Sequence, residues 1–142
     1  MQNSSHHPEI VSRINESFAK QNMMSLLKAE ITVENPGNVV ISAPILPETH
    51  QQHGFAHAAV AFALGDSAAG YAALSVMPPD REVLTAEMKI NLLAPAAGQE
   101  LRAIGHVIKP GKRLVIVGAT VLAIDQGKET EIAVLQGTMV PV

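Results

Sequence analysis

The sequence predicts an α+β fold in which a curved antiparallel sheet wraps around one long central helix. Two observations indicate this fold. Residues 56–77, AHAAVAFALGDSAAGYAALSVM, form one apolar, alanine-rich stretch of helical length. Beyond it the apolar residues alternate with polar ones, the period-two pattern of β-strands, in runs longer than common strands. Long antiparallel strands after a single helix indicate a sheet curled around that helix.

Size and composition limit the class of protein. The 142 residues suffice for one domain with a hydrophobic core. A net charge of −3 argues against nucleic-acid binding, and the absence of cysteine excludes disulfides, thiolate metal sites and cysteine nucleophiles. The N-terminal segment MQNSSHHPEIVSR has no basic stretch followed by an apolar core, so we expect no secretory signal and a cytoplasmic protein. The acid within 56–77 favours a buried helix over a membrane span.

Residues 1–28 are predicted to form an N-terminal helical segment ahead of the main domain, 29–142. Pro8 suits the first turn of a helix, and Ile10, Ile14 and Phe18 then recur on one helical face. A Met/Leu-rich joint, 23–27, follows. The segments AEITVEN and VVISAPI flank a turn at residues 36–38, which predicts a β-hairpin. A polar loop then leads into the long helix.

After the helix, four strands are predicted. In VLTAEMKINLL the alternation places five apolar residues on one face: Leu84, Ala86, Met88, Ile90 and Leu92. Three further strands are expected around 99–109, 112–125 and 129–140, each interrupted by a glycine that can supply a bend or bulge (Gly105, Gly118, Gly137).

The segment from Leu114 to Ile124 is apolar on both faces, with Thr120 as its single polar side chain. One face can pack on the helix, and the other needs a second cover. No further helix is expected to supply that cover, so we expect a partner subunit to do so.

Asp66 is the strongest candidate for a functional residue. It is the sole carboxylate within residues 56–77, where His57 and Tyr71 are the other ionisable groups. An ionised carboxylate in an apolar setting costs several kcal/mol unless it is paired, hydrogen-bonded or hydrated. Alanine would pack there without this cost, which favours a functional acid over a satisfied structural carboxylate.

Two other groups of polar residues admit alternatives. The spacing of His50, His53 and His57 could supply metal ligands, but polar loop histidines, with His57 orienting the helix start, are the preferred interpretation. The basic turn of Lys109, Lys112 and Arg113 could be simply solvated or could bind the phosphates of a nucleotide-like ligand.

The stretch QQHGFAHAAVAFALGD resembles the hotdog-fold acyl-CoA thioesterases, in the branch of the phenylacetate-pathway and 4-hydroxybenzoyl-CoA thioesterases. That branch reads N-x-x-G-x-x-H-G-G, with an acid eight positions after the first glycine of HGG. The spacing aligns Gln51, Gly54, His57 and Asp66 with this pattern. TAEMKINLLAPA and KPGKRL also resemble the family, whereas Ala58 and Ala59 replace the two glycines.

The resemblance implies a hotdog fold and hydrolysis of an acyl-CoA thioester. Ala58 N–H would polarise the thioester carbonyl, and Asp66 would act as general base or nucleophile. Gln51 would orient the carbonyl or water, and Thr85 would hydrogen-bond Asp66 or water. Residues with expected substrate contacts are Gly54 in the loop and Lys109, Gly111, Lys112 and Arg113 at the turn that contacts the CoA nucleotide. No metal and no cofactor apart from CoA, as part of the substrate, is implied.

Helix geometry adds an argument about assembly. Ala58 and Asp66 are eight residues apart, hence separated by roughly 12 Å along one helix at 1.5 Å per residue. One thioester cannot contact both, so a site shared by two antiparallel copies is expected, giving a homodimer at least. For a thioesterase of the family that the chain resembles, the favoured assembly is a homotetramer. We expect neither nucleic acid nor membrane as a partner. The alternatives are a hotdog hydratase or dehydratase and a non-catalytic acyl-CoA-binding or regulatory module; the acyl group stays open.

Overall fold

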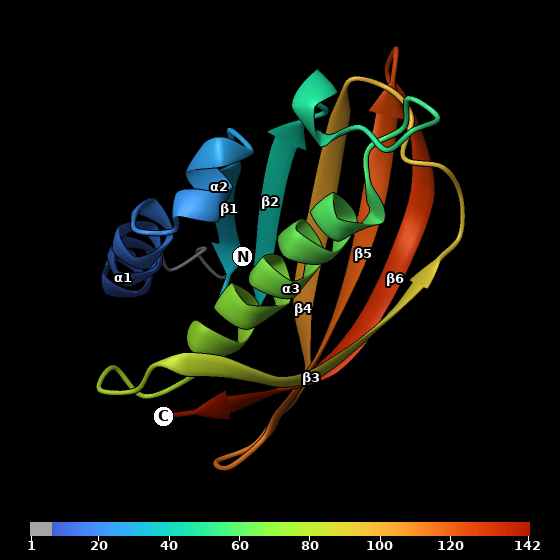
Figure 1. Ribbon diagram of the computed structural model, residues 1–142. Coiled ribbons are helices and arrows are strands. Elements are labelled where there is room, and N and C mark those ends of the chain that lie inside the picture. Colours follow the sequence, from blue (N-terminus) through green and yellow to red (C-terminus); the bar gives the residue numbers. More distant parts are fainter. Residues whose placement is uncertain (1–6) are drawn as a thin grey trace, which may run out of the picture.

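The computed structural model of the protein describes residues 7–142; residues 1–6 of the predicted N-terminal segment lie outside this range. Its elements follow one another along the chain as shown in Figure 1: α1 Pro8–Ala19, α2 Asn22–Leu26, β1 Glu30–Asn35, β2 Asn38–Pro44, the 3₁₀ helix η1 Pro47–Thr49, α3 Ala58–Leu74, β3 Val83–Leu92, β4 Glu100–Pro110, β5 Val115–Asp125 and β6 Lys128–Pro141. The expected joint at 23–27 lies largely within the short helix α2. No helix among the described residues is long and apolar enough to cross a membrane.

The six strands form one antiparallel sheet in the order β1-β2-β4-β5-β6-β3. Figure 1 shows the sheet curving around α3, which lies along its inner face. This confirms the predicted hotdog fold. Within residues 7–142, β1 and β3 are the two edge strands, and β3, which follows α3 in the sequence, pairs with β6 alone.

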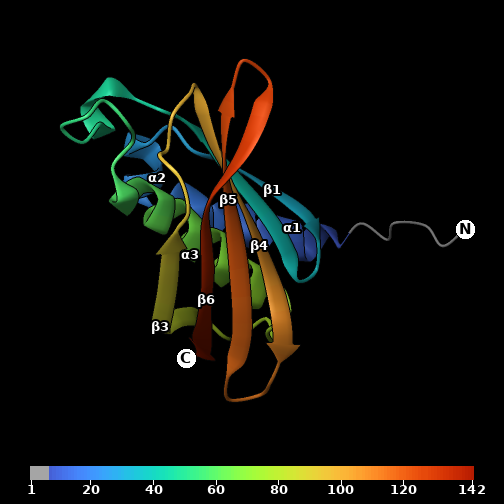
Figure 2. The same ribbon diagram turned by 90° about the vertical axis from the view of Figure 1, so that its right-hand side faces the viewer.

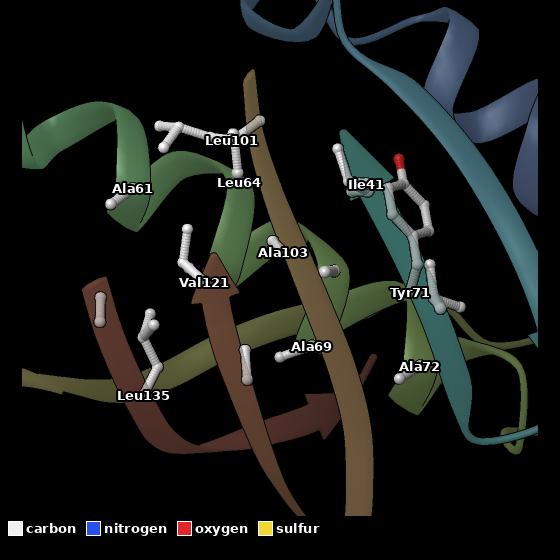
Figure 3. Packing of buried hydrophobic residues seen from close by; sticks show 14 of the residues in the cluster. Ile41, Ala61, Leu64, Ala69, Tyr71, Ala72, Leu101, Ala103, Val121 and Leu135 are labelled. Atoms are coloured by element: carbon white, nitrogen blue, oxygen red, sulfur yellow. The ribbon is translucent and has the colours of Figure 1, made fainter. Parts of the chain in front are cut away.

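Small side chains let α3 lie close to the sheet. Ala68 and Ala69 are fully buried, and the helix crosses β4 at Gly105. A Cβ atom at position 105 would lie 2.3 Å from the carbonyl carbon of Ala68, which is closer than any side chain tolerates. Glycine in β4 therefore permits the close helix–strand approach rather than a bulge, which corrects the expectation for Gly105. Figure 3 shows other residues that α3 contributes to this packing, among them Ala61, Leu64 and Ala72.

The alternation predicted for β3 is broken by a register shift between Thr85 and Glu87. Thr85 pairs with Met139 and Met88 pairs with Gly137, and these two residues of β6 share the inner face. Thr85 therefore faces α3 together with Met88, whereas Leu84 turns to the opposite face. The prediction that Leu84 shares a face with Met88, Ile90 and Leu92 was wrong, because the bulge at Ala86, which has no partner in β6, shifts the side-chain alternation by one residue.

The outer face of the sheet carries apolar side chains. In β5 the inner residues, such as Val117 and Val121, are fully buried, whereas the outer Ile116, Leu122 and Ile124 are only half-buried. Figure 2 views this outer face, and the labelled helices α1, α2 and α3 lie behind the sheet. Cover of this face by a partner subunit therefore stays a prediction.

Candidate active site

Asp66 lies in the middle of α3, half-buried, on the side of the helix that faces the first residues of β3. The Thr85 hydroxyl donates a 2.9 Å hydrogen bond to Asp66 Oδ1 and also contacts the sulfur of Met139 at 3.3 Å. Burial raises the pKa of the Asp66 carboxyl above its ordinary value, and the Thr85 hydrogen bond acts in the opposite direction. The result is a carboxylate held in one orientation and made more basic than a solvated one.

A cavity of about 280 Å³ lies beside Asp66, and polar side chains from α1 and from the joint to α2 form part of its wall. Tyr71, in α3, accepts a 2.7 Å hydrogen bond from Gln21 Nε2, and its hydroxyl lies 3.1 Å from that of Ser17. Sequence analysis missed Ser17 and Gln21. Gln21 lies beyond the end of α1, so no helical spacing relates it to Ser17, and no local signal in the sequence could have found the pair.

The start of α3 is a second cluster of predicted site residues. His57 is the N-cap: its Nδ1 accepts a 2.9 Å hydrogen bond from Ala59 N–H, which confirms that His57 orients the helix start. Val60 N–H donates to the His57 carbonyl at 2.9 Å. Among the described residues, no acceptor lies within hydrogen-bond range of the exposed Ala58 N–H. Ala58 thus presents a free donor at the positive end of the helix dipole.

The loop before α3 is organised by Gln51. Its side-chain oxygen accepts hydrogen bonds from the backbone N–H groups of His53 and Phe55, and its own backbone N–H donates to the Phe55 carbonyl at 2.8 Å. Gly54 has φ +82°, a left-handed conformation that favours glycine. With its side-chain oxygen engaged, Gln51 has its amide NH₂ group to offer to a ligand.

A largely apolar cavity of about 410 Å³ adjoins the helix start, and both Gln51 and Ala58 line it. Asp66 and Thr85 line the other cavity. The structure therefore brings Gln51, His57 and Ala58 together, and separately Asp66 and Thr85, but does not unite the two groups within one chain.

The basic residues lie at and beside the β4–β5 turn. Lys109 is near the end of β4, while Gly111, Lys112 and Arg113 form the turn; all four are exposed. Gly111 and Lys112 line a groove of about 440 Å³, together with residues that follow α3, including Arg81. The predicted phosphate contacts therefore lie beyond the C-terminal end of α3, at the end opposite to Ala58.

The described histidine and carboxylate side chains do not gather into a metal site. Across residues 7–142, no three such groups are placed to hold a metal ion. His57 uses Nδ1 for the helix cap instead.

The chain resembles known proteins over nearly its full length. The model of the thioesterase superfamily matches residues 53–130. A thioesterase family protein from Silicibacter pomeroyi is 38% identical, with a TM-score of 0.92 over 94% of this chain and 98% of that one. Among curated proteins, no significant sequence match is found.

Two more distant structures share the fold. The PaaI protein from the phenylacetic acid degradation operon of E. coli is 19% identical, with a TM-score of 0.84 over 95% of this chain and 94% of that one. Thioesterase HI1161 from Haemophilus influenzae is 18% identical, with a TM-score of 0.80 over 92% of this chain and 89% of that one.

Proposed function

The chain belongs to the thioesterase superfamily, and we propose that it hydrolyses acyl-CoA thioesters at a site shared between two copies of the chain. The observation that carries this proposal is Asp66, a half-buried carboxylate with a raised pKa and an orientation set by Thr85. A base with a pKa raised toward the working pH accepts a proton from water more readily than a solvated aspartate does.

In the proposed reaction, the thioester carbonyl oxygen accepts a hydrogen bond from Ala58 N–H of one copy. Asp66 of the other copy removes a proton from water, whose oxygen attacks the carbonyl carbon. The carbon–sulfur bond then breaks, and the CoA thiolate leaves and takes up a proton. Alternatively, Asp66 attacks the carbonyl carbon itself and forms an anhydride, which water opens. A free N–H group at a helix start contributes about 3 kcal/mol to stabilising the developing oxyanion.

Two copies can complete the site through the edge strand β3. Its outer edge has unpaired backbone groups over ten residues. Thr85, at one end, lines the cavity of Asp66, and Leu92, at the other end, lines the cavity of Ala58. Antiparallel pairing of two β3 strands sets the Thr85 end of one copy beside the Leu92 end of the other. The same pairing therefore joins the two half-sites twice in each dimer.

The remaining predicted residues have supporting roles in this proposal. The amide NH₂ of Gln51 orients the carbonyl or water, and Gly54 allows the loop conformation that carries Gln51. Lys109, Lys112 and Arg113 bind the phosphates of CoA, for which their exposure and charge suit them. The proposed reaction requires neither a metal ion nor a cofactor. We further propose a cytoplasmic homodimer, with a second pair of copies covering the outer face of the sheet.

Release of free thiol from a panel of acyl-CoAs tests the function. We expect hydrolysis by the wild-type chain and a loss of at least about 100-fold in kcat for Asp66→Asn, which keeps the volume and removes the base. Asp125→Asn is the matched control, because Asp125 is exposed at the end of β5, lines neither cavity, and accepts a hydrogen bond from Gln99 Nε2 that an asparagine Oδ1 can also accept. Binding of acyl-CoA without turnover by the wild-type chain would favour a non-catalytic binding module instead. Near wild-type turnover by Asp66→Asn would remove Asp66 from the mechanism.

A further inference from the structure

We infer that the apolar cavity at the start of α3 binds the acyl group of the substrate, and that it selects apolar acyl chains over hydroxylated ones. This inference rests on the proposed function, because that function places the thioester carbonyl at Ala58 N–H, on the rim of this cavity.

The two cavities of the shared site differ in chemical character. Nine of the twelve residues that line the helix-start cavity are apolar; examples are Phe55, Ala61, Leu92, Ala94, Ala96 and Ile132. Seven of the eleven residues around the Asp66 cavity carry polar side chains, among them Ser17, Gln21, Tyr71 and Glu82. The two sides of the thioester therefore meet different surroundings.

The position of the cationic side chains indicates which of the two cavities holds the pantetheine arm of CoA. Arg81 and Lys112 line the groove at the β4–β5 turn. Arg81 adjoins Glu82, which lines the Asp66 cavity, and Met139 of that cavity is two residues from Pro141 of the groove. The polar Asp66 cavity thus leads toward the cations of its own chain. The polar pantetheine arm with its phosphates follows this route.

The acyl group must then extend from the carbonyl to the other side, into the helix-start cavity of the copy that supplies Ala58. The cavity volume, about 410 Å³, lies in the range of small-molecule sites. Its apolar wall has few groups to satisfy a buried hydroxyl, so a hydroxylated acyl chain would lose hydrogen bonds to water without replacement.

Ala94 is suited to test the cavity. It lies in the loop after β3, half-buried, and lines the cavity without belonging to the catalytic groups. Ala97, three residues further in the same loop, is also half-buried but lies outside this cavity lining. Ala94→Leu and Ala97→Leu therefore make the same chemical change inside and outside the cavity.

We expect kcat/KM of the wild-type chain to rise about fourfold for each methylene added to a straight acyl chain, the equivalent of about 0.8 kcal/mol, until the cavity is full. For an ω-hydroxylated acyl-CoA, kcat/KM should be at least about tenfold lower than for its apolar counterpart. Ala94→Leu should move the optimum to acyl chains about three carbons shorter, because leucine has three more carbon atoms than alanine. Ala97→Leu should leave the optimum in place.

The inference is overturned if kcat/KM does not depend on chain length, if hydroxylated chains are preferred, or if Ala94→Leu and Ala97→Leu shift the optimum equally. Complete absence of hydrolysis would instead contradict the proposed function. In that case, affinities of non-hydrolysable acyl-CoA thioethers for the same two variants decide the inference. Loss of long-chain affinity in Ala94→Leu alone supports it, and equal affinities contradict it.

Discussion

Thr85 Oγ1 donates a 2.9 Å hydrogen bond to Asp66 Oδ1 because a register shift in β3 turns Thr85 toward α3. With regular alternation from Met88, Thr85 would lie on the outer face of the sheet, away from the helix. The bulge therefore brings a hydroxyl to the carboxylate without disturbing the apolar contacts of Met88 and Ile90 with the core. Bulges commonly re-aim a single side chain in this way beside active sites.

The first prediction concerns this hydrogen bond. In the wild type, the Thr85 hydroxyl lowers the pKa of Asp66 by its hydrogen bond. Thr85→Val removes this donor, so the pKa of Asp66 should rise further in the variant. The reaction needs ionised Asp66, so the acid limb of the pH–rate profile should move to higher pH. Thr85→Ser keeps the hydroxyl and should leave the limb near its wild-type position. The profile of kcat/KM with one acyl-CoA measures the shift, and a limb that stays fixed in Thr85→Val would contradict the assignment of Asp66 as base.

The second prediction concerns stability. Because burial raises the pKa of Asp66, the folded state favours the protonated carboxyl. The contribution of Asp66 to the free energy of unfolding is therefore fully present below its unfolded pKa, about 3.9, and is lost as the pH rises through the higher folded pKa. Asp66→Asn removes the ionisation and should raise Tm at pH 7 by about 3 °C; Asp66→Ala should act in the same direction.

The pH dependence distinguishes this cause from a change in packing. The gain in Tm of Asp66→Asn should shrink as the pH falls through the folded pKa and should be absent at about pH 3.5. A gain that stays constant between pH 3.5 and pH 7 would show that ionisation of Asp66 is not its source. Asp125→Asn provides the comparison with an exposed carboxylate.

The local sequence pattern was sufficient to predict much of this fold. Alternation and turn residues predicted the hairpin and the later strands, and the solitary acid in an apolar helix singled out Asp66. The bulge at Ala86 was not predictable in this way, because VLTAEMKINLL alternates without interruption and the shift depends on pairing with β6.

Contacts between distant parts of the chain account for the other differences. Ser17 and Gln21 reach Tyr71 across 54 and 50 residues, and only the packing of α1 on the domain makes them part of the wall beside Asp66. Gly105 was expected to bend its strand, yet its role is set by the backbone of α3 at Ala68. Neither relationship has a signal in the residues next to it.

The third prediction concerns the basic turn. Replacement of Lys112 and Arg113 together by alanine should raise KM for acyl-CoA about tenfold and leave kcat nearly unchanged, because phosphate contacts far from the reacting carbon contribute uniform binding. Higher salt should reduce the difference from wild type. Lys128→Ala is the control, since Lys128 is an exposed lysine at the β5–β6 turn, at the other end of β5. The effect should disappear with an acyl-pantetheine substrate, which lacks the nucleotide, and an equal loss with that substrate would assign the turn a structural role.

The last prediction tests whether two copies share the site. Ala58→Pro removes the N–H donor at the first position of α3, where proline is tolerated. The local backbone suits this change: His57 has ψ 143°, the extended conformation that a residue before proline adopts, and no acceptor is bound to the lost N–H among the described residues. Ala58→Pro and Asp66→Asn should each be nearly inactive when assembled alone.

In a mixed dimer of these two variants, one site combines the intact Asp66 of the Ala58→Pro copy with the intact Ala58 of the Asp66→Asn copy, and the other site carries both lesions. Co-refolded or exchanged mixtures should therefore recover up to about one quarter of wild-type activity, because random pairing makes about half of the dimers mixed and each of these has one intact site out of two. Asp66→Asn mixed with Asp66→Ala is the control, because every site in such a dimer lacks the carboxylate and no activity should be recovered. If differently tagged subunits co-purify as heterodimers and the Asp66→Asn/Ala58→Pro mixture stays inactive, the two groups do not serve one thioester across the dimer, and a single-chain site that uses only one of them or a non-catalytic binding role becomes the better account.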